Sequence, residues 1–241
     1  MNTTDLILLF LSVLVSGTLF FLIRNPSPHL LKLILAFSGA FLFALTVLHL
    51  MPETYANSGP GIGAWILAGF LIQIILEFFS EGIEHGHVHV HDHNQNRFPL
   101  AMMLSLSLHS FLEGMPLSSD TGQDGHGHGL LYGIMLHHAP VAFALTSMLT
   151  ASGLSRRYAF LYLLIFAAMA PLGAFFSMWA HEASGEMIRA AYPALMAIVI
   201  GIFLHISTTI LFESSNNHRF NLYKMAAITG GGLIGLLAYW S

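Results

Sequence analysis

The sequence predicts an all-α polytopic membrane protein with eight transmembrane helices. Of its 241 residues, 55% are hydrophobic and only 8% are charged, whereas about 25% of the residues of a typical soluble domain are charged. Several apolar runs also approach the roughly 20 residues with which a helix crosses the hydrocarbon layer of a bilayer. Such a chain cannot cover a soluble globule with charge, and it is expected to form a single transmembrane domain over residues 1–241.

Segment length, charge and the positions of glycine and proline divide the chain into its expected spans. The first span contains Asp5 and has no basic segment before it, so it is interpreted as a helix and not as a cleaved signal. The turn 25–28, Asn-Pro-Ser-Pro, separates it from the second span, because proline cannot continue a helix. The expected spans are residues 5–23, 31–51, 61–79, 99–117, 130–150, 156–179, 190–212 and 221–240.

The basic residues predict the orientation of these spans. With eight spans, all but one of the 8 Lys and Arg residues fall in loops on one face, and the positive-inside rule makes that face cytoplasmic. An integral protein of the plasma or inner membrane, with both termini outside, is therefore expected. The residues on the basic face are Arg24, Lys32, Arg97, Arg156, Arg157, Arg219 and Lys224, and the exception is Arg189.

Histidine is abundant and cysteine is absent. The chain has 15 His and 0 Cys, which excludes disulfides and thiolate metal sites. Residues 80–98 are expected to form a mobile cytoplasmic loop, because alternate histidines and small residues offer little surface for packing. This loop is a candidate metal-binding segment, and an affinity tag is the alternative. Its alternate histidines are His85, His87, His89, His91 and His93. The net charge of −4 indicates no nucleic-acid partner, and none is expected.

Four ionisable residues lie inside two apolar spans and form the candidate site. His109 and Glu113 are one helical turn apart near the middle of span 99–117, and His137 and His138 follow at a similar depth in the next span. An ionisable group at bilayer depth costs at least a few kcal/mol and normally faces a protein interior or a water-filled path. Nitrogen ligands with one carboxylate suit Zn²⁺ or a similar divalent ion. Which of the adjacent histidines is the ligand stays open.

Other polar residues and prolines lie near the ends of the spans. His49 and Glu53 share a helix face at the expected outer mouth. A lone membrane histidine such as His49 or His205 is also explained by a hydrogen bond to a neighbouring helix, and Gln73 and Glu77 are interpreted as satisfying contacts between helices. Glu213 ends its span on the inner side. Pro116 and Pro140 are expected to bend their helices and free a carbonyl.

At these residues the chain resembles the ZIP family of divalent-metal transporters. The resemblance rests on SGAFLFALTVLHLMPE in the second span, HSFLEG in the fourth, HHAP in the fifth, eight spans and a His-rich third loop. It implies that helices 1–3 and 6–8 form an inverted repeat around helices 4 and 5. It also implies that His109, Glu113 and His137 are metal ligands, and that Ser110 replaces the family's asparagine.

The resemblance further implies that acidic ligands of a second metal are missing. His138 and Val141 stand where the family has acids in the fifth span, and Ala170 may stand for another in the sixth. The expected function is therefore movement of one divalent ion, Zn²⁺ before Cd²⁺, Fe²⁺ or Mn²⁺, into the cytoplasm by alternating access. The expected path runs from His49 and Glu53 through the central site to Glu213 and the loop histidines. A homodimer is left open.

Two other classes compete with a transporter. A non-transporting metal-binding or sensory membrane protein would have the same site, and the missing carboxylates leave that alternative open. The other class is an enzyme, either an intramembrane metalloprotease or a haem protein. The protease would need His-Glu-x-x-His, which the sequence lacks. A haem protein would use the paired histidines inside the membrane as haem ligands. The chain is expected not to be an enzyme.

Overall fold

The computed structural model describes residues 2–23, 28–80, 100–118, 127–183, 186–212 and 222–240, and within these ranges all regular secondary structure is helical. Its helices are α1 (Thr3–Leu19), α2 (Pro28–Leu45), α3 (Met51–Ser58), α4 (Gly63–Ser80), α5 (Leu100–Gly114), α6 (Gly127–Ala151), α7 (Arg156–Ala183), α8 (Glu186–Phe212) and α9 (Leu222–Trp240). Short π or 3₁₀ turns at Thr46–Leu50, Pro60–Ile62 and Met115–Ser118 adjoin α2, α4 and α5.

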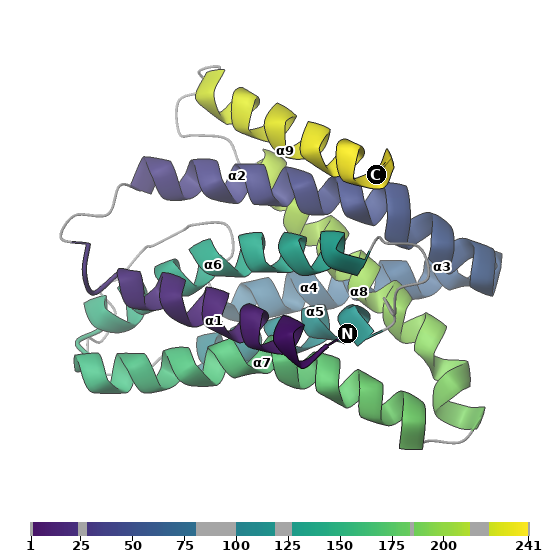
Figure 1. Ribbon diagram of the computed structural model, residues 1–241, viewed down its shortest axis with the longest axis horizontal. Coiled ribbons are helices and arrows are strands. Elements are labelled where there is room, and N and C mark those ends of the chain that lie inside the picture. The colour runs from purple at the N-terminus through teal and green to yellow at the C-terminus, as the bar shows by residue number, and fades with distance from the viewer. Residues whose placement is uncertain are drawn as a thin grey trace.

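Seven of these helical segments are long and apolar enough to cross a membrane. The eighth, α1, has 17 residues and a length of roughly 26 Å at 1.5 Å per residue, which is at the lower limit for a span. The expected first span, residues 5–23, thus ends four residues early, because the chain turns at Phe20. In Figure 1, α1 begins and α9 ends toward the same end of the bundle.

The second span is longer than the sequence predicted. Residues 31–51 were expected, but helical structure continues past Pro52 to Ser58. A proline inside an α-helix clashes with the carbonyl four residues earlier. Here the π turn immediately before Pro52 changes the hydrogen bonding, and the N–H of Met51 donates to the carbonyl of Thr46. The wider turn lets the helix pass the proline.

The helices pack in two groups. In the first, α1 packs against α6 and α7, and α5 packs against α7; in the second, α2 packs against α9, and α4 against α8. Figure 1 shows α9 beside α2 at one edge of the bundle, and α7 beside α1 at the opposite edge. The two groups meet where α2 contacts α6 and where α4 contacts α5. The central site lies on α5 and α6, close to these contacts.

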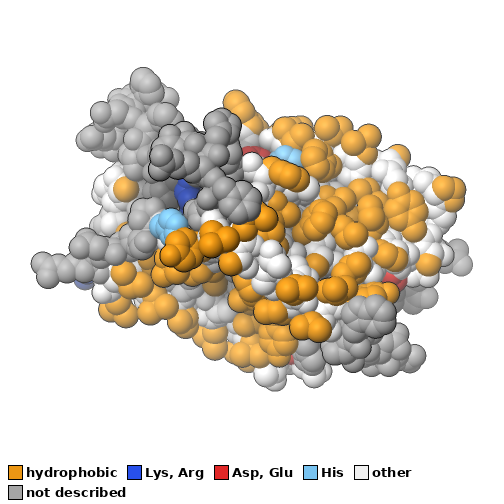
Figure 2. Space-filling model, turned by 90° about the horizontal axis from the view of Figure 1, so that it is seen from above, with side chains coloured by type: hydrophobic (Ala, Val, Ile, Leu, Met, Phe, Trp, Pro, Cys, Tyr) orange, Lys and Arg blue, Asp and Glu red, His pale blue; other side chains and the backbone are white. Residues whose placement is uncertain are grey.

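Apolar side chains lie on the outside of the bundle as well as in its core. Leu233 and Leu237 on α9 are more than half exposed, and Figure 2 shows hydrophobic side chains spread across the described part of one face. The fully buried core residues include Phe166, Phe203 and Leu106. A surface of this kind suits a lipid environment, in which exposed apolar side chains carry no solvation cost.

Glycines set the closest helix contacts. A Cβ added at Gly231 of α9 would lie 2.2 Å from the carbonyl oxygen of Phe37 in α2, and one at Gly235 would lie 2.6 Å from the Cβ of Ala44. Small residues at these two positions therefore let α9 pack closely against α2. Gly232, by contrast, has open space beside it.

We expect Gly231→Ala to lower the thermal stability of the protein in detergent, because the new methyl group would force α9 away from α2. The matched control is Gly232→Ala, in which the methyl group meets nothing and alanine improves helix propensity by up to about 1 kcal/mol. Melting curves followed by size-exclusion chromatography test this. Equal melting temperatures for the two variants would contradict the observed packing of α9.

Candidate metal site

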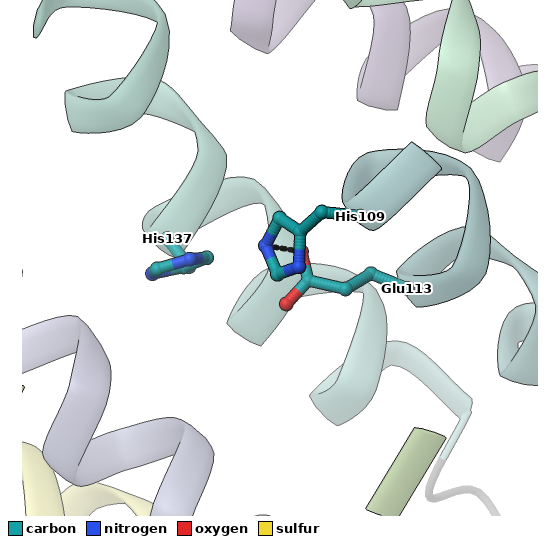
Figure 3. A group of neighbouring side chains, drawn as sticks. All are labelled: His109, Glu113 and His137. Carbon is teal, nitrogen blue, oxygen red and sulfur yellow. Dashed lines mark ion pairs between the residues drawn. The ribbon is translucent and has the colours of Figure 1, made fainter. Parts of the chain in front are cut away.

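Two neighbouring helices bring four titratable side chains together in the interior of the bundle. His109 and Glu113 lie one turn apart on α5, and His137 and His138 lie near the middle of α6. All four side chains are fully buried. The i, i+4 spacing places the first two on the same helix face, and this face points toward α6 (Figure 3). The sequence-predicted residues therefore do form one cluster.

The carboxylate of Glu113 is at the centre of this cluster. Its Oε2 lies 3.3 Å from Nε2 of His109, and the same oxygen is in hydrogen-bond contact with Nε2 of His138. The ring of His109 lies nearly perpendicular to that of His137, with centroids 6.2 Å apart. Figure 3 shows the His137 ring facing the His109–Glu113 pair from the other helix. One carboxylate is thus surrounded by three imidazoles.

The donor atoms have the spacing of a metal site. One donor atom each from His109, Glu113 and His137 lie within 4.8 Å of one another. In tetrahedral zinc sites the bonds are about 2.0–2.2 Å, which puts two ligand atoms roughly 3.3 Å apart, as His109 and Glu113 are. Within the described residues, Oε1 of Glu113 and Nδ1 of His138 have no hydrogen-bond partner. An unsatisfied buried polar atom costs about 1–3 kcal/mol, and a bound cation would offset this cost.

Both adjacent histidines approach Glu113, although neighbouring helix positions point about 100° apart. His138 contacts the carboxylate directly, whereas His137 belongs to the three-residue group with His109. The centroids of the two rings are 5.9 Å apart. The geometry is therefore compatible with either histidine, or both, as ligands.

Backbone contacts between α5 and α7 hold Glu113 in place. A Cβ on Gly114 would lie 2.0 Å from the carbonyl oxygen of Ala170, and one on Gly173 would lie 1.9 Å from that of Phe111. Each glycine thus lets the other helix approach directly beside the site. Substituting either one would push α5 and its two site residues away from α7.

The two prolines near the site behave differently. The prediction that Pro116 bends a continuous helix is wrong: α5 ends at Gly114, and Pro116 lies in the 3₁₀ turn that follows. A tighter turn accommodates proline, which lacks an N–H for the α-helical ladder. Pro140 does lie inside α6. Next to it, the hydroxyl of Ser16 in α1 donates to the carbonyl of Ala139 at 2.5 Å.

A cavity of about 200 Å³ lies at the end of the bundle where α3 ends and α4 begins. His49 and Glu53 line it, with Nε2 and Oε2 4.0 Å apart, as does Tyr192 from α8. Pro116, three residues after Glu113, is also in the lining. The cavity therefore approaches the central site from this end, and the predicted mouth residues do share it.

The remaining predicted path residues are only partly described. His205 on α8 is buried, and its Nδ1 lies 3.4 Å from Oε2 of Glu77 on α4. The interpretation of Glu77 as a residue that satisfies a helix contact is compatible with this pair, but sequence analysis did not connect it with His205. The other path residues, Glu213, His85, His87, His89, His91 and His93, lie outside the described residues.

Comparison with known proteins now identifies the family. A family model described as ZIP zinc transporter matches residues 84–238. The chain belongs to the ZIP family. Zinc transporter ZIP9-B of Xenopus laevis is 27% identical over 159 residues, 64% of this chain and 52% of the relative. Zinc transporter ZIP1 of Danio rerio is 33% identical over 109 residues, 44% of this chain and 35% of the relative.

Membership of the ZIP family confirms the resemblance and the expectation that the chain is not an enzyme. It is an integral membrane protein with several candidate spans. The chain spans about half the length of the ZIP9 relatives it matches, 52% in the case of ZIP9-B. Ser110, Val141 and Ala170, the positions where the resemblance implies other residues in the family, are all buried.

We expect divalent metal to raise the melting temperature of the purified protein through this site, because a ligand that binds only the folded state stabilises it by about 2.7 kcal/mol at one hundred times its Kd. Glu113→Gln should remove most of the Zn²⁺-induced shift, since the amide has no charge to offer. Thr150→Val is the control and should retain it, because Thr150 lies outside the cluster and its hydroxyl donates to the carbonyl of Thr146 in its own helix. An unchanged shift in Glu113→Gln would refute the site.

Proposed function

We propose that this ZIP-family chain moves a divalent metal ion, Zn²⁺ in the first place, across the membrane into the cytoplasm. The central site of His109, Glu113, His137 and His138 binds the ion on its way. The relatives that the chain matches are named zinc transporters, which supports the choice of metal. Cd²⁺, Fe²⁺ and Mn²⁺ are the next candidates.

The observation that carries this proposal is the buried carboxylate of Glu113 between imidazoles from two helices. Charged groups inside spanning helices are costly and mark ion pathways. A site that holds a metal ion permanently needs the lone pairs of all its donor atoms to be satisfied. A site for a transported ion must also release that ion. The central site has four donor groups but no second carboxylate that could bridge two metal ions. This donor set supports binding from which the ion can be released.

The donor set favours a single zinc-like ion. Imidazole suits zinc and its neighbours, while manganese and magnesium prefer carboxylates and water. Ser110, Val141 and Ala170 supply no carboxylate for a second ion beside the first. The proposal therefore assigns one metal to the central site, with His137 or His138 completing the set made by His109 and Glu113.

Helix packing supports an inverted repeat and alternating access. The first three spans are α1, α2 with α3, and α4, and the last three are α7, α8 and α9. If these two sets are related by inversion around α5 and α6, then the contact of α2 with α9 corresponds to that of α4 with α8. The contact of α1 with α6 then corresponds to that of α5 with α7. All four of these contacts are extensive in the structure. Such a repeat allows a central site to open first toward one side and then toward the other.

The proposed path enters through the cavity at His49 and Glu53 and leaves toward Glu213 and the histidines of loop 80–98. Exit is aided by protonation of His137 or Glu113, because metal ligands must be deprotonated to bind. The positive-inside rule supports an exit in the cytoplasm and both termini outside. The homodimer that the sequence leaves open stays untested.

Uptake by proteoliposomes or expressing cells tests the proposal. We expect selective uptake of zinc, compared with cadmium, iron and manganese, and a loss of at least tenfold in Glu113→Ala and His109→Ala, because each removes a charged or nitrogen ligand. Membrane insertion of the variants is checked by their abundance in the membrane fraction. Retained uptake in the inserted variants would eliminate the central site as the transport site.

The missing second-site carboxylates favour one alternative, a metal-binding sensor that does not transport. The same experiment separates the two functions. Metal binding at Glu113 without flux of any of the four metals would establish the sensor and reject the transporter.

The orientation is tested with introduced cysteines, since the chain has 0 Cys of its own. Gly61 and Ser155 are exposed at turns on opposite sides of the bundle. A membrane-impermeant maleimide should label Gly61→Cys in intact cells and Ser155→Cys only after permeabilisation. The reverse pattern would place the termini in the cytoplasm.

A further inference from the structure

The hydroxyl group of Ser16 on α1 bonds to a different helix. Ser12 and Thr18 donate to carbonyls of α1 itself, which is the usual bond of a serine or threonine inside a helix. The hydroxyl of Ser16 instead donates to the carbonyl of Ala139 in α6, at 2.5 Å. Ser16 is therefore attached to the part of α6 that directly follows the two site histidines.

Close packing brings α1 to this position. α1 lies against both α6 and α7, and α1 and α6 begin at the same end of the bundle (Figure 1). A Cβ added at Gly17 would lie 2.4 Å from a methyl group of Leu163 in α7 and 3.0 Å from the hydroxyl oxygen of Thr146 in α6. Ser16 and Ala139 lie at similar distances from the starts of their helices, about 20 Å and about 18 Å at 1.5 Å per residue. The bond thus joins two helices that already pack in register.

The bond reaches α6 where the hydrogen bonding of this helix is interrupted. Pro140 has no N–H, so the carbonyl of Leu136, four residues earlier, loses its α-helical partner. Helices bend most easily at such positions. Ala139 directly precedes the proline, and the Ser16 hydroxyl therefore holds α6 from outside at the residue next to the interruption.

Both site histidines lie within two residues of this bond. His138 contacts Oε2 of Glu113, and its ring packs against that of Phe166 in α7 with centroids 5.9 Å apart. His137 provides a donor atom to the group that includes the two ligands of α5. A change of bend at Ala139 would turn both imidazoles relative to α5, because the parts of a helix on either side of a bend move as units.

We propose that Ser16 is a positioning residue of the central metal site and acts through the carbonyl of Ala139. By fixing α6, it sets the positions of His137 and His138 relative to Glu113. This role rests on the proposed function, in which the central site binds a divalent ion. Zinc ligands must lie about 2.0–2.2 Å from the metal, so a small rotation of the imidazoles weakens binding although α1 supplies no ligand.

The zinc affinity of Ser16→Ala tests this role. All proteins carry serine at the five alternate histidines of the loop, so that the loop adds no metal, and the zinc equivalent that Glu113→Gln removes defines the central site. Competition with a zinc-binding dye measures its Kd. We expect Ser16→Ala to raise this Kd by roughly two- to tenfold, the equivalent of one hydrogen bond. Ser16→Thr, which keeps the hydroxyl, should restore most of the affinity.

Ser12→Ala is the matched control. Ser12 lies one turn earlier on α1 and its hydroxyl donates to the carbonyl of Leu9, so its removal should leave the Kd unchanged. Melting of the metal-free proteins reports any loss of packing separately from the loss of affinity. Monodisperse Ser16→Ala protein with the Kd of the control would overturn the proposal.

Cobalt provides a measurement that a general loss of stability does not change. Co²⁺ occupies zinc sites, and its visible absorption depends on the arrangement of its ligands. At saturating Co²⁺, Ser16→Ala should show altered bands, while Ser16→Thr and Ser12→Ala should keep those of the wild type. An unaltered spectrum in Ser16→Ala would mean that the imidazoles keep their positions, and would overturn the positioning role.

The outcomes separate this role from the proposed function. If Ser16→Ala weakens zinc binding and alters the cobalt spectrum but the wild type transports no metal, the proposed function fails and the positioning role stands. If zinc uptake depends on Glu113 while Ser16→Ala changes neither the Kd nor the spectrum, the positioning role fails alone. A wild type that binds no zinc equivalent through Glu113 overturns both.

Discussion

The fold depends on keeping the negative charge of Glu113 inside an apolar bundle. A single buried carboxylate is tolerated only when other groups compensate its lost hydration, and here imidazoles of α5 and α6 contact it. That contact requires the helices to stay close and in register. The glycines opposite Ala170 and Phe111 provide this closeness from the α7 side. Chemistry and packing at the centre are therefore one constraint, because loosening α5 against α7 would also separate the ligands.

The spans were predictable because hydrophobicity acts locally. A run of about 20 apolar residues is helical in a bilayer whatever its neighbours are, since the backbone must satisfy its own hydrogen bonds. The errors lie at the prolines. The expected second span stops at residue 51, and Pro116 is expected to bend its helix, yet Pro52 follows a π turn inside a continuous helix and Pro116 lies in a terminal 3₁₀ turn. Which turn a helix adopts around proline depends on the surrounding packing, and composition does not contain this information.

The site was predictable where its residues share a helix and only partly where they do not. The spacing of His109 and Glu113 guarantees one face, and similar depth brings α6 to it. The pairing of Glu77 with His205 depends on the rotation of α4 against α8, which the contacts of Gly69 and Gly201 set. These contacts join residues more than a hundred positions apart. Both His137 and His138 of α6 lie in the cluster, which spacing alone left undecided.

Three histidine–carboxylate pairs now follow the length of the bundle, and their exposure forms a sequence with physical meaning. The side chains of His49 and Glu53 are 30% and 62% exposed, with Nε2 and Oε2 4.0 Å apart. The central pair of His109 and Glu113 is fully buried at 3.3 Å, and the pair of His205 and Glu77 is intermediate at 3.4 Å. Attraction between a cation and a carboxylate strengthens as water is excluded. On the proposed path, capture at the mouth would thus be weak and fast, and selection would belong to the centre.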